Sequence, residues 1–598
     1  MGVLLGAGAA LTRTRIAFAL ILLAAAAVLY ARRLGDAPVY MSPDEVIIAV
    51  DAHSLATTGR DVHGVSLPLY FKIQMRGDER QGWFMPVIFY ATAGVLKVLP
   101  LSEVSARLPS VIVGLTDIVL IFFIARRLFR CDWLGMAAAV MLTLTPAHFI
   151  LSRYALDYLY PTPFLLAWLL CVLSYLESGS RRTLFAGTLL LGVGFYSYIA
   201  AIVLAPIALL STAAILFHER KPARDYAVAA SGFALPLLLL LPWIASHPTA
   251  FADTASRYEL YNTSQMDALQ GLRSFFSYNN IEQRAGIYWS FLNPSFLFFT
   301  GDAQMPFSTR AVGVFLMPAA VLMIAGICYA IRRPSPAHLL VLLGFFCAPL
   351  AAVLVPENSE IIRAAAMLPF GVLLAAMGVE AFWQWGRLDR ARAIVMPAGV
   401  AMLAGGLAYA GWTLATRHHL TASTGPLILG GAALCAIAFA SDAISVTKIA
   451  AVLLLLAMPV QFAGFARDYF GDYRRRSSNW LDGNIRGALV DLIHREARDH
   501  APFIYFSQLR STSGLADTRN RWMETYWTFY LTKEKRRDLL ERTRVFDPAR
   551  VSAVPPRSLV LANIGDPSID RLVREGALKR VQTIVDADGT TFYTILQR

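Results

Sequence analysis

Long apolar runs alternate with short polar connections along most of the chain. Thirteen runs stand out, and each is long enough, at about 16–22 residues, to cross the core of a bilayer as an α-helix. The pattern therefore predicts a polytopic α-helical membrane protein with about 13 transmembrane helices. The runs cover residues 15–30, 109–125, 134–151, 161–177, 183–199, 200–217, 226–245, 311–331, 337–355, 364–383, 393–414, 425–440 and 449–466.

Three longer polar pieces interrupt or follow these runs, at residues 31–108, 246–310 and 467–598. The first contains an amphipathic stretch, 83–100, whose pattern favours a helix lying in the membrane interface. The second is crowded with aromatic residues. No connection separates the runs 183–199 and 200–217, so the chain must break tightly between Tyr196 and Ala200.

The polar tail predicts a small α/β domain. Its pattern indicates a helix near 483–500, a strand at 502–507, helices near 519–543 and a strand at 558–563. A hairpin follows at 579–596 and turns on Asp588-Gly589. The chain thus divides into a transmembrane module, residues 1–466, and a soluble domain, residues 467–598.

Composition supports a membrane protein. Of 598 residues, 56% are hydrophobic and only 16% are charged, against roughly 25% charged in soluble proteins. This excludes soluble globular, disordered and disulfide-stapled classes. The five cysteines lie in or beside apolar runs and form no CxxC motif, so they indicate neither a disulfide framework nor a zinc site.

Basic residues predict the orientation of the chain. The N-terminal tail and the short connections on its side hold 16 Lys and Arg, whereas the short connections on the other side hold three, Arg153, Arg363 and Arg417. The positive-inside rule therefore places the N-terminus in the cytoplasm and, with an odd helix count, the C-terminal domain outside. The net charge of +13 is largely this signal, and we expect no nucleic-acid binding. Residues 16–30 also match a signal-peptide core, but Arg32 and Arg33 directly after them favour an uncleaved span.

Few carboxylates are expected at the outer membrane surface. Asp44 and Glu45 follow Pro43, which predicts a helix start with Ser42 as its cap. They either favour the helix dipole only or supply a catalytic base. Asp157 lies in the short turn after the third run, one helical turn beyond Arg153. It either pairs with Arg153 or faces the same cavity as Asp44.

Several other residues are candidates for binding. Phosphate-binding candidates are Lys72, Arg80, Arg153 and Arg363, although Arg363 also suits a cation anchored at the membrane surface. His148, Tyr154, Tyr196 and Tyr198 lie near outer span ends, where aromatics are usually belt residues. His53 and His63 lie close to Asp51 and Asp61, but their i,i+2 spacing does not suit a helical metal site.

The order of these motifs resembles the C-type (GT-C) membrane glycosyltransferases, which use polyprenyl-phosphate-linked sugars. The relevant branch contains protein O-mannosyltransferases and the bacterial aminoarabinose transferase that acts on lipid A. The resemblance is clearest over residues 40–200 and looser beyond. It is carried by Asp44-Glu45, Gly82-Trp-Phe-Met-Pro86, Ser105-Ala-Arg-Leu-Pro-Ser110, Ala125-Arg-Arg-Leu-Phe129, Asp157, Gly194-Phe-Tyr-Ser-Tyr198, the segment Pro294–Asp302 and the segment Arg363–Pro369.

The resemblance implies an inverting sugar transfer at the outer face. Asp44 would be the general base, and Glu45 and Asp157 would place acceptor or donor. A groove between spans, near Tyr154, Tyr196 and Tyr198, would hold the prenyl chain. Chemically, one carboxylate must take the proton of the acceptor hydroxyl, whereas a phosphate leaving group needs positive charge. No cofactor is required, and a divalent metal is possible without support from the sequence.

The sequence departs from the aminoarabinose branch at one position. There a lysine precedes the proline of the first-loop motif and contacts phosphate, whereas Phe84 and Met85 occupy that place here. Either Lys72, Arg80 or Arg363 takes over, or the donor is handled differently.

The expected function is therefore transfer of one sugar from undecaprenyl phosphate to a hydroxyl of an envelope acceptor, in a bacterial inner membrane with the C-terminal domain in the periplasm. The acceptor would be lipid A or core oligosaccharide, a glycolipid, a glycan or a protein. The alternatives are a flippase of lipid-linked sugars, which more often has repeated halves and ionisable groups at the midplane, and an envelope-assembly scaffold without catalysis.

Overall fold

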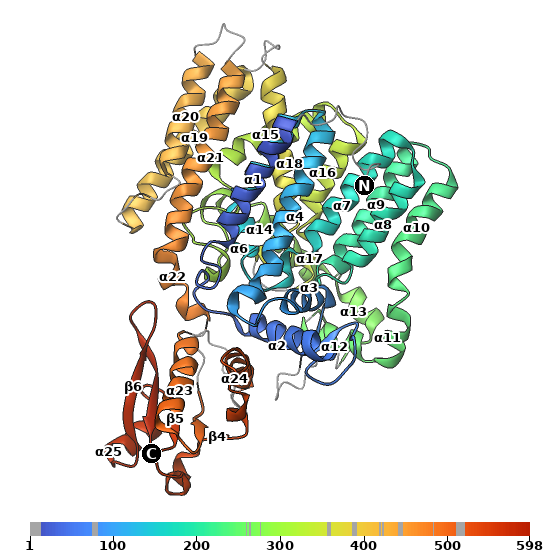
Figure 1. The fold of residues 1–598 in the computed structure, drawn as a ribbon. Coiled ribbons are helices and arrows are strands. Elements are labelled where there is room, and N and C mark those ends of the chain that lie inside the picture. The colour runs from blue at the N-terminus through green and yellow to red at the C-terminus, as the bar shows by residue number, and fades with distance from the viewer. Residues whose placement is uncertain are drawn as a thin grey trace.

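The computed structural model describes residues 13–598 except 74–81, 259, 262–264, 276, 356–359, 386–391, 418–419, 421–423, 440–445, 482 and 510–520. The membrane module is a bundle of helices, with shorter helices, α2, α3 and α12, lying across one end (Figure 1). Its α-helices are α1 Arg13–Ala31, α2 Pro43–Thr58, α3 Pro86–Leu96, α4 Glu103–Phe129, α5 Asp132–Thr143, α6 Pro146–Leu151, α7 Pro161–Ser178, α8 Arg181–Gly194, α9 Ala201–His218, α10 Ala223–Leu237, α11 Leu240–Ser246, α12 Ala250–Arg257, α13 Ala268–Phe275, α14 Tyr278–Phe291, α15 Met317–Arg332, α16 Pro336–Cys347, α17 Leu350–Val353, α18 Met367–Trp385, α19 Arg392–Arg417, α20 Thr424–Phe439 and α21 Val446–Phe470.

Each of the thirteen predicted apolar runs coincides with one helix or with two consecutive helices. In the part of the chain that is described, nine helical segments are long and apolar enough to cross a membrane. Three further runs are shorter apolar helices, α5, α15 and α20, and α8 covers the run 183–199. The run 134–151 is divided because Pro146 begins a new helix, α6. The predicted tight break lies between α8 and α9.

The C-terminal domain is the expected α/β domain. Its helices are α22 Asp472–Arg476, α23 Ile485–Asp499, α24 Arg521–Lys533 and α25 Pro567–Arg574; its strands are β3 Ile504–Phe506, β4 Thr543–Val545, β5 Leu559–Asn563, β6 Lys579–Val585 and β7 Thr591–Gln597. The sheet has the order β4-β3-β5-β7-β6, with β3 parallel to both neighbours and the β6–β7 hairpin antiparallel. The short strand β4 and the helix α25 were not predicted.

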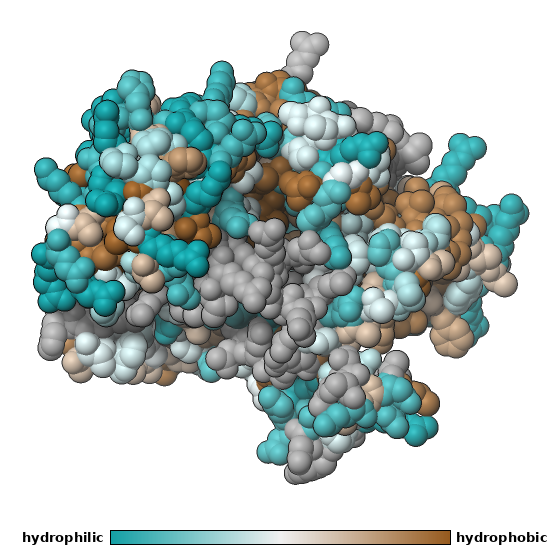
Figure 2. Space-filling view, turned by 90° about the horizontal axis from the view of Figure 1, so that it is seen from below, coloured by the Kyte–Doolittle hydropathy of each residue, from teal (hydrophilic) through white to brown (hydrophobic). Residues whose placement is uncertain are grey.

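The C-terminal domain projects from the end of the bundle at which α2, α3 and α12 lie across the long helices (Figure 1). Helix α24 packs on α2, so the domain touches the first polar segment directly. Seen from this end, the domain at the upper left is mostly hydrophilic, whereas hydrophobic residues gather on the bundle beside it (Figure 2). This contrast fits one module immersed in lipid and one in water.

A buried polar network crosses the bundle, which the sequence did not reveal. Asp117 lies midway along α4 and is fully buried. One of its carboxylate oxygens accepts a hydrogen bond from Thr162 and lies 3.3 Å from Nε2 of His148. His148 Nδ1 in turn lies 2.9 Å from the hydroxyl of Tyr30 in α1. Buried ionisable groups in membrane helices are expected to be paired in this way, and the network joins four helical segments.

Candidate active site

The first site residue, Asp44, is positioned by the cap of α2. The hydroxyl of Ser42 accepts the N–H of Glu45, and the Glu45 carboxylate accepts the N–H of Ser42 at 2.9 Å. This capping box, with Pro43 in the first turn, fixes where the helix begins, as the sequence predicted. Asp44 is therefore held in the first turn, half-buried, at the positive end of the helix dipole.

Glu45 has a different role from the predicted one. Its side chain is fully buried and forms an ion pair with the fully buried Arg107 of α4, at 2.8 Å from Nε. The same carboxylate accepts the N–H of Ala155 at 2.9 Å. Both oxygens are thus occupied by protein, so Glu45 does not contact acceptor or donor. Instead it ties α2 to α4 and to the turn that carries Asp157.

Arg153 is also not a phosphate-binding residue, because its guanidinium is buried and used internally. It donates to the carbonyls of Tyr30, Arg32 and Ala37, and to the hydroxyl of Tyr469. Arg107 likewise donates to the carbonyls of three residues, Leu34, Pro38 and Tyr40. The two arginines therefore support the whole connection between α1 and α2 from beneath. The alternative pairing of Arg153 with Asp157 is not observed.

Three acids and one cation lie near one another at the outer end of the bundle, where the turn Asp157–Leu159 packs against the turn Ile361–Arg363; we call Asp44, Asp157, Glu360 and Arg363 the outer cluster. Asp157 is buried, and the charge of Asp44 acts on it. Asp44, Asp157 and Glu360 all lie near enough to the hydroxyl of Tyr158 for their charges to interact with it. Arg363 lies 4.0 Å from the carboxylate of Glu360. Arg363 and Asp157 both lie near enough to the hydroxyl of Tyr198 to interact with it electrostatically. The structure thus brings together Asp44, Asp157, Arg363 and Tyr198 of the predicted site.

Glu360 was missed by sequence reasoning, and so was the residue that holds it, Asp302. The Asp302 carboxylate accepts the N–H of Ile361 at 2.5 Å and the N–H of Gln304 at 2.8 Å, and the Gln304 amide donates to Glu360 at 3.1 Å. Burial, opposed by these N–H groups, raises the pKa of Asp302 to about 6. The sequence did offer a signal for Asp302, because this residue ends the Pro294–Asp302 motif. Glu360 lies in a polar turn, and no motif in the sequence pointed to it.

An open apolar groove of about 870 Å³ reaches the break between α8 and α9 at Tyr196. Helix α3 and helix α11 line it, and Tyr196 lies at its wall with its hydroxyl on the carbonyl of Pro236. Tyr196 and Tyr198 belong to the same short break between α8 and α9, so this break connects groove and cluster. Tyr154 does not line the groove: it is buried, and its hydroxyl donates to the carbonyl of Pro306.

Two predicted phosphate ligands are not placed at the cluster. Lys72 lies in β1, Phe71–Ile73, opposite Trp83 of β2, Gly82–Phe84, and its carbonyl lies 3.2 Å from the His63 ring. Arg80 lies outside the described residues. Arg363 is therefore the predicted cation that the structure brings to the acids.

The carboxylates around His53 and His63 order a loop. Asp51 accepts the N–H of Val62 at 3.0 Å, and Asp61 accepts the N–H groups of His63 and Val65. In the parts of the chain that the structure describes, no three His, Cys, Asp or Glu side chains are arranged to hold a metal ion.

Burial makes Asp51 a source of pH-dependent stability, because it raises the pKa of this carboxyl to about 6. Folding buries the ionised carboxyl unfavourably, so the protein loses stability as the pH rises. The loss is negligible near pH ~4 and complete above about pH 6. Asp51→Asn keeps an oxygen for the N–H of Val62. We expect it to raise the free energy of unfolding by about 1–3 kcal/mol at pH ~7.5 and to have little effect at pH ~4. Thermal unfolding in detergent at both pH values measures this, and an equal gain at both would contradict it.

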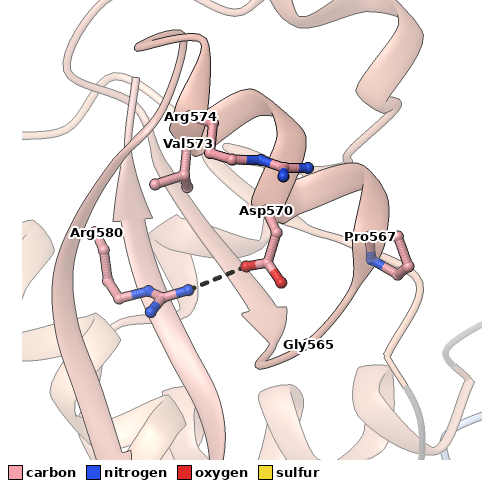
Figure 3. Close-up of a pocket in the computed structure, with 6 residues that line it drawn as sticks. All are labelled: Gly565, Pro567, Asp570, Val573, Arg574 and Arg580. Carbon is pink, nitrogen blue, oxygen red and sulfur yellow. Dashed lines mark hydrogen bonds and ion pairs between the residues drawn. The ribbon is translucent and has the colours of Figure 1, made fainter.

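A second open pocket, of about 580 Å³, lies on the C-terminal domain (Figure 3). It is lined by α25 and β6, where Arg580 pairs with Asp570 at 3.2 Å. It shares no residue with the outer cluster or with the apolar groove, so we do not assign it to the same site.

Comparison with known proteins supports the fold and the class of the chain. The model of the dolichyl-phosphate-mannose-protein mannosyltransferase family matches residues 85–245, from α3 to α11, which include Asp157. ArnT from Cupriavidus metallidurans in the apo state has the same fold, with a TM-score of 0.53 and 16% identity over 97% of this chain and 98% of that one. The resemblance to the C-type membrane glycosyltransferases is confirmed.

Two further structures are similar. ArnT bound to undecaprenyl phosphate matches with a TM-score of 0.50 and 13% identity over the same shares of the two chains. The oligosaccharyltransferase of Archaeoglobus fulgidus in the apo form matches with a TM-score of 0.43 and 13% identity, over 85% of this chain and 64% of that one. No curated protein matches the sequence. The glycosyltransferase family and the ArnT fold together bear out the expectation of a glycosyltransferase enzyme.

Proposed function

We propose that this membrane glycosyltransferase transfers a sugar from a polyprenyl phosphate to a hydroxyl of an envelope acceptor, with inversion. The observation that carries the proposal is the outer cluster itself, in which Asp44 lies near Asp157, and Asp157 and Arg363 both lie near Tyr198; an apolar groove is lined by Tyr196 of the same short break. The groove suits a prenyl chain, and ArnT, which shares the fold, has been solved with undecaprenyl phosphate bound.

In the proposed reaction, the carboxylate of Asp44 takes the proton of the acceptor hydroxyl. The acceptor oxygen attacks the anomeric carbon from the face opposite the phosphate, and the bond between that carbon and the phosphate oxygen breaks. The bonding pair leaves with the phosphate, whose charge Arg363 stabilises. Asp157, held by burial beside Asp44, positions the sugar. No cofactor is needed in this scheme, because the phosphate is the leaving group.

We further propose that the site faces the periplasm of a bacterial inner membrane, with the N-terminus in the cytoplasm. The distribution of 16 basic residues against three in the short connections supports this orientation. The outer cluster and the C-terminal domain lie at the same end of the bundle, so one orientation places both outside.

Mass spectrometry of envelope lipids and glycans from cells with and without this protein tests the function. We expect the loss of one hexose, pentose or uronic acid from one acceptor when the protein is absent. Purified protein should then transfer that sugar from undecaprenyl phosphate to the same acceptor, also after dialysis against EDTA. Identical envelope profiles in the two strains would contradict the proposal.

A further inference from the structure

The segment before Asp44 is held from two sides. From beneath, Arg107 and Arg153 donate to backbone carbonyls between Tyr30 and Tyr40. From the outside, the C-terminal domain contacts the same residues, although some 500 positions separate them along the chain.

Two outer hydrogen bonds reach the residues just before the cap of α2. The hydroxyl of Tyr526 in α24 donates to the carbonyl of Met41 at 2.6 Å. The hydroxyl of Tyr40 donates to the carboxylate of Asp586 at 2.5 Å, at the tip of the β6–β7 hairpin. Tyr526, Tyr40 and Asp586 are all buried, with at most 7% of their surface exposed. Both bonds are therefore shielded from water, and a hydrogen bond is stronger in such a buried environment than it is in water.

Ionic and polar contacts extend this interface on both sides. Lys533, at the end of α24, pairs with the buried Glu103 at the start of α4, at 2.9 Å. Arg474 donates to the carbonyl of Asp36 at 2.7 Å, and Arg486 donates to the carbonyl of Gly35. The domain thus contacts the starts of both helices, α2 and α4, whose Glu45–Arg107 pair lies beneath Asp44.

We propose that the C-terminal domain positions the catalytic base, with Tyr526 and Tyr40 as positioning residues that hold the entry of α2. The inference rests on the proposed role of Asp44. Neither tyrosine touches substrate in this scheme. They fix the backbone at residues 40 and 41, four and three positions before Asp44, so that its carboxylate stays aligned with the acceptor hydroxyl. Misplacement of a reacting group by about 1 Å is enough to slow a reaction strongly.

Tyr526→Phe tests the inference, alone and together with Tyr40→Phe. We expect kcat to fall about threefold to tenfold for the single variant, as for the loss of one buried hydrogen bond, and further for the double variant. The KM for the lipid donor should stay within about twofold, because the groove is lined by α3 and α11 and not by this interface. A purely structural defect would not separate kcat from KM in this way.

Tyr530→Phe is the matched control on the same helix. Tyr530 is also buried, and within the described residues its hydroxyl makes no hydrogen bond. The variant Tyr530→Phe should therefore leave kcat unchanged. Hydrogen exchange of peptides covering residues 30–45 gives a readout independent of activity: we expect faster exchange in Tyr526→Phe than in Tyr530→Phe.

The outcomes separate this inference from the proposed function. Unchanged kcat and unchanged exchange in Tyr526→Phe, or a higher KM at constant kcat, would overturn the positioning role. If Asp44→Asn were fully active, the assignment of Asp44 as the base would fail, and the claim that the domain positions a base would fail with it; failure of the wild-type protein to transfer any sugar would instead contradict the proposed function. Faster exchange in Tyr526→Phe would then still show that the domain orders the segment.

Discussion

Asp44→Asn should abolish sugar transfer while the protein still folds and inserts. Loss of a general base lowers the rate by about 10²–10⁴-fold. Asparagine has nearly the same shape, and the capping box of Ser42 and Glu45 does not involve the Asp44 side chain. The start of α2 is therefore retained, and loss of the favourable charge at the helix dipole costs about 0.3–1 kcal/mol. Initial rates with the purified protein and its lipid-linked donor measure the effect.

A control separates the loss of the base from a loss of charge. Asp472 is an exposed acid that pairs with Arg475 at 3.1 Å, outside the outer cluster, so Asp472→Asn should transfer at the wild-type rate. Binding of undecaprenyl phosphate to Asp44→Asn should be unchanged, because the groove is intact. Transfer by Asp44→Asn at the wild-type rate would show that another group takes the proton.

The second large effect concerns stability, and it arises at the Glu45–Arg107 pair. Glu45→Ala would leave the guanidinium of Arg107 buried without its counter-charge, since both side chains have no exposed surface. Breaking such a pair by removing one partner destabilises by about 3–5 kcal/mol. We expect a much lower melting temperature in detergent and weak expression, together with loss of transfer.

Two further variants show whether the pairing itself is responsible. Arg107→Met combined with Glu45→Leu removes both charges, so it should destabilise less than the sum of the single changes. Arg571→Ala breaks an exposed pair with Glu575 and should change stability by less than about 1 kcal/mol. A melting temperature of Glu45→Ala equal to that of the wild type would mean that the buried charge is compensated elsewhere.

The sequence predicted the helices well because lipid imposes a simple rule on them. A spanning helix needs about 20 predominantly apolar residues in a row, and all thirteen runs coincide with helices. The breaks at Pro146 and after Tyr196 also follow from local residues. Two elements of the soluble domain could not be predicted from the sequence. The strand β4 has three residues and the helix α25 has eight, and both are too short to show a periodic pattern.

The sequence predicted where the charged residues of the site lie more reliably than what their side chains contact. Asp157 lies near Asp44, which was one of the two alternatives for it, but Glu45 and Arg153 turn inward, which spacing along the chain does not reveal. Burial decides between the two roles, and burial depends on segments far away: Arg107 lies 62 positions from Glu45. The same spacing gave no reason to single out Glu360, whose position is set by Asp302, 59 residues from Ile361.

The two buried arginines beneath the first outer segment also have a consequence for biogenesis. Residues 30–41 leave the ribosome early, but the donors that fix their carbonyls come from positions 107 and 153. The segment therefore reaches its final arrangement only after α4 and α6 have been synthesised and inserted. Tyr526 and Asp586 follow near the end of translation. The proposed active site therefore reaches its final arrangement only after the C-terminal domain has been synthesised.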